Sequence, residues 1–445
     1  MQPATITNSA PLSAMAATVV RLMSGIHVLG WADQAVVSIT SFFLLVMIGR
    51  WTDPEQLGIY AIGVSVLALL IATQESLITR PYSIQLHRPT GAPTEHAFSA
   101  FSLSVLLSVA AAFVAGAAAL LASALDANRG LIEIGWALAG VTPFVLMREF
   151  ARKFSFAHLA VARALLLDCA VAALMLLSLT LLAWSGRLSS ANALAVMGIV
   201  CGVASFGWLY FARHDFSCNL RQLVPTFWRS WQIGKWFLSS QLAIQAQGYM
   251  TPWLAMAIAG AAVTGVYVAC TSIVAFANPL LYGFCNVLLP KFVRTLQQQG
   301  VTALRRQACI DAALLGGMMG VFSLAVFAYG ENIMRLLYRG DSYAGYGPVL
   351  VVLAVAAFVA AVGTPASIAL AAAERARSVA GVTALTAMLS LVLIAALLPN
   401  WGLLGVAYGV LAAEIIGSIS RWTVFVLLVP NAVPAGKNTG EPARC

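Results

Sequence analysis

The chain has 445 residues, of which 61% are apolar and only 9% charged, and its formal net charge is +9. Ordinary soluble domains carry about 25% charged residues, so the composition argues against an enzyme with a folded catalytic module outside the membrane. The seven cysteines are scattered and form no Cys-x-x-Cys pair, so neither a disulfide framework nor a zinc site is indicated.

The first half of the chain is expected to form one helical bundle. Residues 1–30 are interpreted as a cytoplasmic tail, because Met1 to Ala16 contain no apolar core of signal-peptide length. A membrane-spanning helix needs roughly 20 apolar residues, and six such segments follow within residues 31–212. They run over residues 31–48, 59–77, 98–124, 131–150, 162–184 and 191–212.

The second half repeats this organisation after a basic cytoplasmic linker at residues 213–235. A second bundle is expected over residues 236–428, and the polar, Pro/Gly-rich residues 429–445 are interpreted as a disordered cytoplasmic tail. The predicted fold is therefore an all-α polytopic membrane protein with about twelve spans. The last six run over residues 238–258, 264–288, 309–333, 348–370, 379–398 and 402–428.

The lysines and arginines fall mainly on one side of these spans. Cytoplasmic loops of membrane proteins carry the Lys/Arg excess, and all but five of the 25 basic residues fall on the side of the spans that would be cytoplasmic. The pattern predicts a multi-pass protein of a bacterial inner membrane with both termini in the cytoplasm. It also accounts for the positive net charge without a nucleic-acid partner. The five outer residues are Arg50, Arg129, Arg187, Arg335 and Arg339.

The two halves resemble each other. A shift of 207 residues aligns Gln34 with Gln241, Gly58 with Gly265, Tyr60 with Tyr267 and Ser65 with Ser272. Because each half would contain an even number of spans, we expect parallel repeats related by a pseudo-two-fold axis normal to the membrane. Substrate is then expected to bind between the halves.

Several stretches resemble a known family. Residues 33–70 contain IGRWTDPEQLGIYAIGVSV, with Arg50, Pro54, Glu55 and then Gly58 to Tyr60. This stretch resembles the first helical hairpin of polysaccharide-exporter flippases, the Wzx-like branch of the superfamily (MOP) that contains MATE drug exporters and lipid II flippases. The stretches 265–290, 152–163 and 399–407 are similar to later parts of that family.

The resemblance implies a flippase for polyprenyl-diphosphate-linked oligosaccharide that works by alternating access and feeds O-antigen, exopolysaccharide or capsule assembly. It implies no cofactor beyond a proton or sodium gradient. The implied partners are membrane lipids, the lipid-linked glycan, and polysaccharide polymerase and co-polymerase proteins.

A diphosphate needs cations, and the candidates are Arg148, Arg152 and Lys153. Arg148 and Arg152 are four residues apart and so share one helix face, and arginine forks suit phosphate geometry. The alternative is ordinary anchoring at the cytoplasmic interface by side chains that snorkel.

Acidic residues inside spans are candidates for ion coupling. Glu414 lies deepest, roughly 18 Å into the last span at about 1.5 Å per residue, and Arg421 is on nearly the same face. An ionisable group at such depth is a functional candidate, although a structural hydrogen bond is the alternative. Asp168 and Glu75 are further coupling candidates, for which the structural interpretation is favoured.

Polar stripes on two adjacent spans are candidates for a glycan-binding cavity. Residues four apart share a helix face, and amides and phenols there can bind sugar hydroxyls, or instead hold helices together. With Gln34, the candidates are Gln241, Gln245, Tyr249, Asn278, Tyr282 and Asn286.

Two other functions compete with the flippase hypothesis. A cation-coupled MATE-type drug or metabolite exporter would favour a deep acidic pocket in the first six spans. A polytopic glycan polymerase or ligase would need a large outer loop or an outer cluster of reactive side chains, and the outer loops here are short. The sequence therefore favours a transporter over an enzyme.

Overall fold

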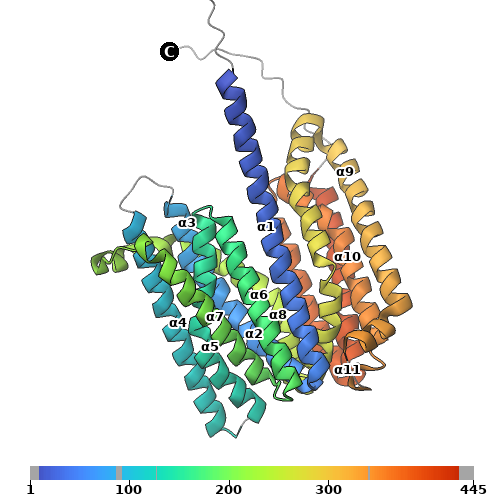
Figure 1. The fold of residues 1–445 in the computed structure, drawn as a ribbon. Helices are drawn as coiled ribbons and strands as arrows, with labels where there is room; N and C mark the ends of the chain where they lie inside the picture. The colour runs from blue at the N-terminus through green and yellow to red at the C-terminus, as the bar shows by residue number, and fades with distance from the viewer. Residues whose placement is uncertain (1–9, 87–92, 127, 339–340, 430–445) are drawn as a thin grey trace, which may run out of the picture. The chain divides into compact units, whose positions relative to one another are not determined.

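The computed structural model describes residues 10–86, 93–126, 128–338 and 341–429, and over these ranges it is helical without any strand (Figure 1). The all-α polytopic fold expected from the sequence is confirmed. The expected C-terminal tail lies outside the described residues from 430 onward, as do residues 1–9.

The first half contains seven α-helices and one π-helical turn. α1 begins at Ala10, so the residues up to Gly30 that were assigned to a tail are helical and continuous with the first span. Side chains of Asn128 and Ser189 cap two helices by accepting hydrogen bonds from the backbone of Gly130 and Asn192. The elements are α1 (Ala10–Trp51), α2 (Pro54–Gln74), the π-turn Glu75–Thr79, α3 (Arg80–Leu86), α4 (Pro93–Ala124), α5 (Arg129–Ala157), α6 (Val161–Trp184) and α7 (Ser190–Ala212).

The second half consists of long helices that are broken at glycines. Gly260, Gly300 and Gly402 have φ of 84°, 80° and 56°, which a glycine adopts without steric cost. Figure 1 shows α9 as two antiparallel arms. The helices are α8 (Leu223–Ala275), α9 (Asn278–Leu337), α10 (Gly347–Ala372) and α11 (Ala376–Leu428), with short 3₁₀ turns at Arg213–Asp215, Leu220–Gln222 and Asp341–Tyr343.

The number of spans agrees approximately with the twelve expected. Ten helical stretches among the described residues are long and apolar enough to cross a membrane. Two of them, residues 287–337 and 377–428, are 51 and 52 residues long and contain the breaks at Gly300 and Gly402. Since one crossing needs roughly 20 residues, each of these two provides two crossings. The chain is a multi-pass membrane protein.

The described chain divides into two compact units. The first contains residues up to Leu44 and Gly63–Leu242, and the second contains Leu45–Ile62 and Ala243–Cys445. The connection between α1 and α2 thus belongs to the second unit although it lies in the first half of the sequence.

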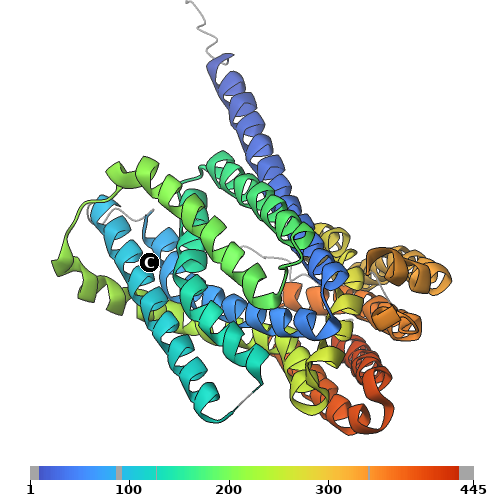
Figure 2. The same cartoon turned by 60° about the horizontal axis from the view of Figure 1, so that its bottom comes forward.

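Aromatic packing fixes the rotation of α5 within the first unit. Phe150 and Phe154 are buried and contact Trp208, with ring centroids 6.2 and 5.4 Å apart. Figure 2 shows α4 and α5 as neighbouring antiparallel helices of this unit, in agreement with their packing. Because Phe150 and Phe154 occupy one face of α5, the residues at 148 and 152 point elsewhere.

Two glycines make a reciprocal contact in the second unit. A β-carbon placed on Gly58 would lie 2.9 Å from the backbone nitrogen of Gly265, and one placed on Gly265 would lie 3.0 Å from that of Gly58. The residues that the 207-residue shift aligns therefore pack backbone to backbone. In this glycine contact each partner meets its counterpart, as in an isologous interface.

Further contacts join distant parts of the chain within the second unit. Arg50 donates hydrogen bonds from Nη1 to the carbonyls of Leu336 and Leu337, at 2.5 and 3.4 Å. The rings of Tyr338 and Tyr343 stack with centroids 4.9 Å apart, and the hydroxyl of Tyr338 is 2.7 Å from that of Ser272. Burial raises the pKa of both phenols, so they remain neutral.

Candidate functional site

A network of buried charges connects three helices of the first unit. Arg152 of α5 contacts Asp33 of α1 (Nη2–Oδ2, 2.6 Å) and Asp168 of α6 (Nε–Oδ2, 2.7 Å). Arg148, one turn earlier on α5, pairs with Asp168 through Nη2 and with Glu149 through Nη1 at 3.1 Å. The structure thus confirms the shared face of Arg148 and Arg152 and shows what that face contacts.

One buried oxygen of this network has no partner. Asp33, Glu149 and Asp168 are buried carboxylates around Arg148 and Arg152, and Lys153 Nζ lies 4.0 Å from Glu149 Oε1. The second carboxylate oxygen of Asp33, Oδ1, is buried and accepts no hydrogen bond from the described residues. A buried acceptor without a donor is costly, and binding a proton or a small cation at this oxygen would satisfy it.

A second group of charges borders the network. Glu75, in the π-helical turn, pairs with Arg80 at 3.0 Å and with Lys153 at 3.2 Å. All three side chains line a cavity of about 420 Å³ whose other walls include the rings of Phe156 and Phe237. The guanidinium of Arg80 lies 5.5 Å from the centroid of Phe237. The predicted diphosphate ligand Lys153 and the predicted coupling residue Glu75 are therefore partners in one cavity.

The second unit holds its buried charges in separate pairs. Lys291 binds Asp311 at 2.9 and 3.0 Å, and Gln307 donates to the same carboxylate at 3.1 Å. Arg421 and Glu414 are 3.2 Å apart. The seven-residue spacing had indicated that pairing, so the sequence identified both the deep acid and its partner.

The polar stripes are only partly described. Gln241, Gln245, Tyr249 and Asn278 are half-buried, whereas Gln34 is exposed and donates to Ser38 at 3.4 Å. The side chains of Tyr282 and Asn286 lie outside the described part of the structure. The two cavities described here are not lined by any residue of these stripes, so their role in binding glycan stays a prediction.

Sequence reasoning missed the position of Asp33. It lies in the first span, more than 100 residues from Arg152, and no local spacing links the two residues. The available signal was a carboxylate within an apolar segment, which is costly unless it is paired.

The chain was compared with known proteins. No protein-family model and no curated protein matches the sequence. Solved structures do match over nearly the whole chain. An inward-facing multidrug resistance MATE family transporter of the MOP superfamily is 14% identical, with a TM-score of 0.71, covering 88% of this chain and 94% of that one. The chain has the fold of MOP superfamily transporters.

Two further structures extend this comparison. An outward-facing MATE family transporter is 13% identical, with a TM-score of 0.59 and coverage of 92% and 95%. A MOP superfamily transporter from Pyrococcus furiosus is 13% identical, with a TM-score of 0.60 and coverage of 92% of this chain and 95% of that one. Its binding pocket is described as having reverse polarity, which suggests a different function for that protein. The fold therefore occurs in both inward- and outward-facing conformations, and its pockets differ in polarity.

Proposed function

We propose that the protein flips an anionic, lipid-linked oligosaccharide across the bacterial inner membrane by alternating access. The observation that carries this proposal is the state of the buried acids. Among the described residues, the four buried carboxylates are all paired with Arg or Lys, and they are Asp33, Glu149, Asp168 and Asp311.

This pairing supports a flippase over an exporter of cationic drugs. A cationic drug is held best by an unpaired carboxylate in a cavity, and here each buried carboxylate would first have to release its own cation. The cavity residues Arg80 and Lys153 together with Glu75 carry a net positive charge, which favours an anionic substrate. With the basic loops in the cytoplasm, this cavity would open where a lipid-linked precursor is made.

We assign ion coupling to the buried network of the first unit. Arg148 and Arg152 already hold three carboxylates, so a diphosphate would have to displace Asp33 and Asp168 to reach them. The orphaned oxygen of Asp33 suits a proton or a small cation instead. Asp168, already a coupling candidate, is a partner of the same site.

The test measures the side of the membrane on which lipid-linked glycan accumulates in a strain that lacks this gene. Spheroplasts and lysed cells are treated with a glycosidase that cannot cross the membrane. We expect accumulated units to be cleaved only after lysis, and a plasmid copy of the gene to reverse the accumulation. Units that are cleaved in intact spheroplasts would point to a polymerase or ligase. No accumulation, combined with sensitivity to cationic dyes, would point to a drug exporter.

A further inference from the structure

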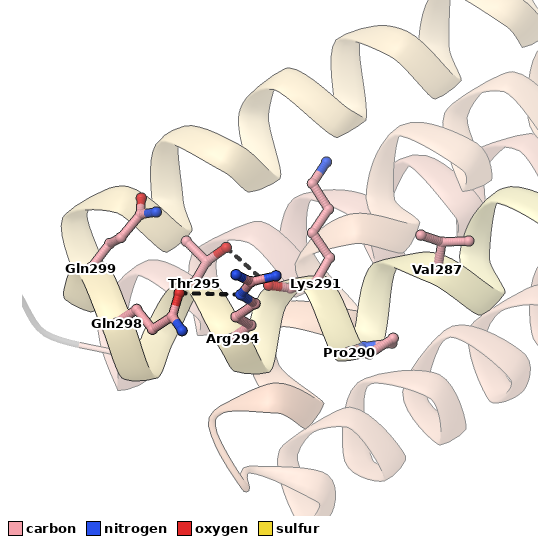
Figure 3. Close-up of a pocket in the computed structure, with 7 residues that line it drawn as sticks. All are labelled: Val287, Pro290, Lys291, Arg294, Thr295, Gln298 and Gln299. Atoms are coloured by element: carbon pink, nitrogen blue, oxygen red, sulfur yellow. Dashed lines mark hydrogen bonds between the residues drawn. The ribbon is translucent and has the colours of Figure 1, made fainter. Parts of the chain in front are cut away.

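One face of α9 forms a polar groove in the second unit. Seven residues of the first arm line a volume of about 470 Å³, within the range of about 300–1,000 Å³ typical of ligand pockets. Figure 3 shows Lys291, Arg294 and Gln298 projecting from successive turns of this arm, ahead of the break at Gly300. The remaining lining residues are Val287, Pro290, Thr295 and Gln299.

The groove contains cations and hydrogen-bond donors but no acid. Lys291 is engaged with Asp311 on the second arm of α9. Arg294 is exposed, and no carboxylate lies within ion-pair distance of it among the described residues. Its Nε donates to Gln298 at 3.2 Å (Figure 3), and its two Nη groups make no hydrogen bond to any described residue. Arg294 therefore presents an open guanidinium fork, the donor geometry that suits phosphate.

The first unit has a cavity at the equivalent position. The 207-residue shift that aligns the two glycines of the glycine contact also places Arg80, Ser83 and Ile84 on Val287, Pro290 and Lys291. The first three residues line the cavity of the first unit, and the last three line the groove. The two repeats thus share the position of a cavity but not its charges, because Arg80 is aligned with Val287 and Lys291 with Ile84.

We propose that the groove binds a phosphate or diphosphate group carried on a lipid, with Arg294 as its principal ligand and Lys291 and Gln298 as supporting donors. The lipid that carries this group would be an isoprenoid diphosphate, and that identification rests on the proposed function. Bulk anionic phospholipid is the other source of the same chemistry. The groove would recognise the phosphate group in the same way whichever of these two lipids carries it.

Arg294 is the residue to change. Replacing Lys291 would leave the fully buried Asp311 without its cation and would destabilise the protein, whereas Arg294 is exposed and holds no carboxylate. Arg306 provides the matched control, because it is an exposed arginine on the second arm of α9 and does not line the groove. Arg294→Lys keeps the charge and removes the fork.

The experiment measures the affinity of farnesyl diphosphate for the full-length protein in uncharged nanodiscs, with phosphatidylglycerol as competitor. Hydrogen bonds to charged groups contribute about 1.5–3 kcal/mol, so Arg294→Ala should raise Kd at least tenfold. We expect Arg294→Lys to raise it less and Arg306→Ala to leave it unchanged.

The outcomes separate this inference from the proposed function. Equal affinity in wild type and Arg294→Ala, or equal losses in the Arg294 and Arg306 variants, would overturn the phosphate site even if the deletion strain accumulates glycan as expected. A loss confined to Arg294 supports the site. Competition by phosphatidylglycerol at similar concentration then identifies phospholipid as the source, and failure to compete identifies the carrier. If Arg294→Ala weakens binding but the deletion strain accumulates no glycan, the phosphate site stands and the proposed flippase function is wrong.

Discussion

The two sequence repeats are alike at a pair of glycines that both lie in the second unit, whereas the two units differ in how they hold charge. Gly58 and Gly265, aligned by the repeat, make equivalent contacts with each other. The first unit gathers Asp33, Glu149 and Asp168 around Arg148, Arg152 and Lys153 in one network. The second unit keeps its charges in separate one-to-one pairs. The backbone contact follows the duplication, while the ionisable chemistry has become concentrated in one copy. This difference suggests a division of labour, with ion binding in one unit and phosphate binding in the other.

The largest effect is expected at the centre of the network. Arg152→Ala removes the cation shared by Asp33 and Asp168, and breaking a buried pair costs about 3–5 kcal/mol. We expect a lower midpoint of thermal unfolding in detergent and loss of export. Arg163→Ala is the control, because Arg163 is exposed on neighbouring α6 and should change stability by less than about 0.5 kcal/mol. Equal midpoints for the two variants would show that the network contributes nothing to stability.

The glycine contact should respond symmetrically. A valine at Gly58 would place its β-carbon against the carbonyl oxygen of Ala261, and one at Gly265 against that of Pro54, besides the backbone of the partner glycine. Overpacking costs about 1–3 kcal/mol, and more where backbone cannot move. We expect the two variants to lose similar stability and similar export activity. Gly140→Val is the control, since a side chain there meets nothing within 4 Å. A large loss at only one of the two glycines would mean that the contact is not equivalent from its two sides.

The smallest effect is expected from changing single acids, which tests whether ion coupling belongs to the first unit. Asp33→Asn should remove the dependence of export on the ion gradient, because it takes away the carboxylate whose orphaned oxygen we assign to the coupled ion. Glu414→Gln alters an isolated pair with Arg421, so it should slow export by less and leave most of that dependence. Export is compared with and without an uncoupler. If Glu414→Gln abolished the gradient dependence and Asp33→Asn preserved it, coupling would belong to the second unit.

Periodic and short-range features could be predicted from the sequence. Apolar runs located the spans, and the seven-residue spacing predicted the partner of Glu414. The shift of 207 residues aligned Gly58 with Gly265 before any contact between them was known. These features depend on helix geometry or on duplication, and both leave regular spacings in the chain.

Contacts between helices distant in sequence could not be predicted in the same way. In the sequence Arg148 and Arg152 looked like cations free to bind a diphosphate. In the structure Asp33 of α1 and Asp168 of α6 pair with them. A carboxylate and an arginine that pair across two helices have no fixed separation in the sequence, so no pattern of spacing reveals the pair. Arg294, by contrast, was one basic residue among many, and its distinction is that it lines a groove together with Lys291 and has no carboxylate partner among the described residues.

The glycine contact has an electrical consequence. Moving one elementary charge through a membrane potential of 100 mV releases about 2.3 kcal/mol, so any continuous file of water through a protein in an energised membrane dissipates that potential. Helices that touch backbone to backbone leave no room for such a file at their crossing. The absence of side chains at Gly58 and Gly265 lets the two backbones meet without a gap for water at this crossing.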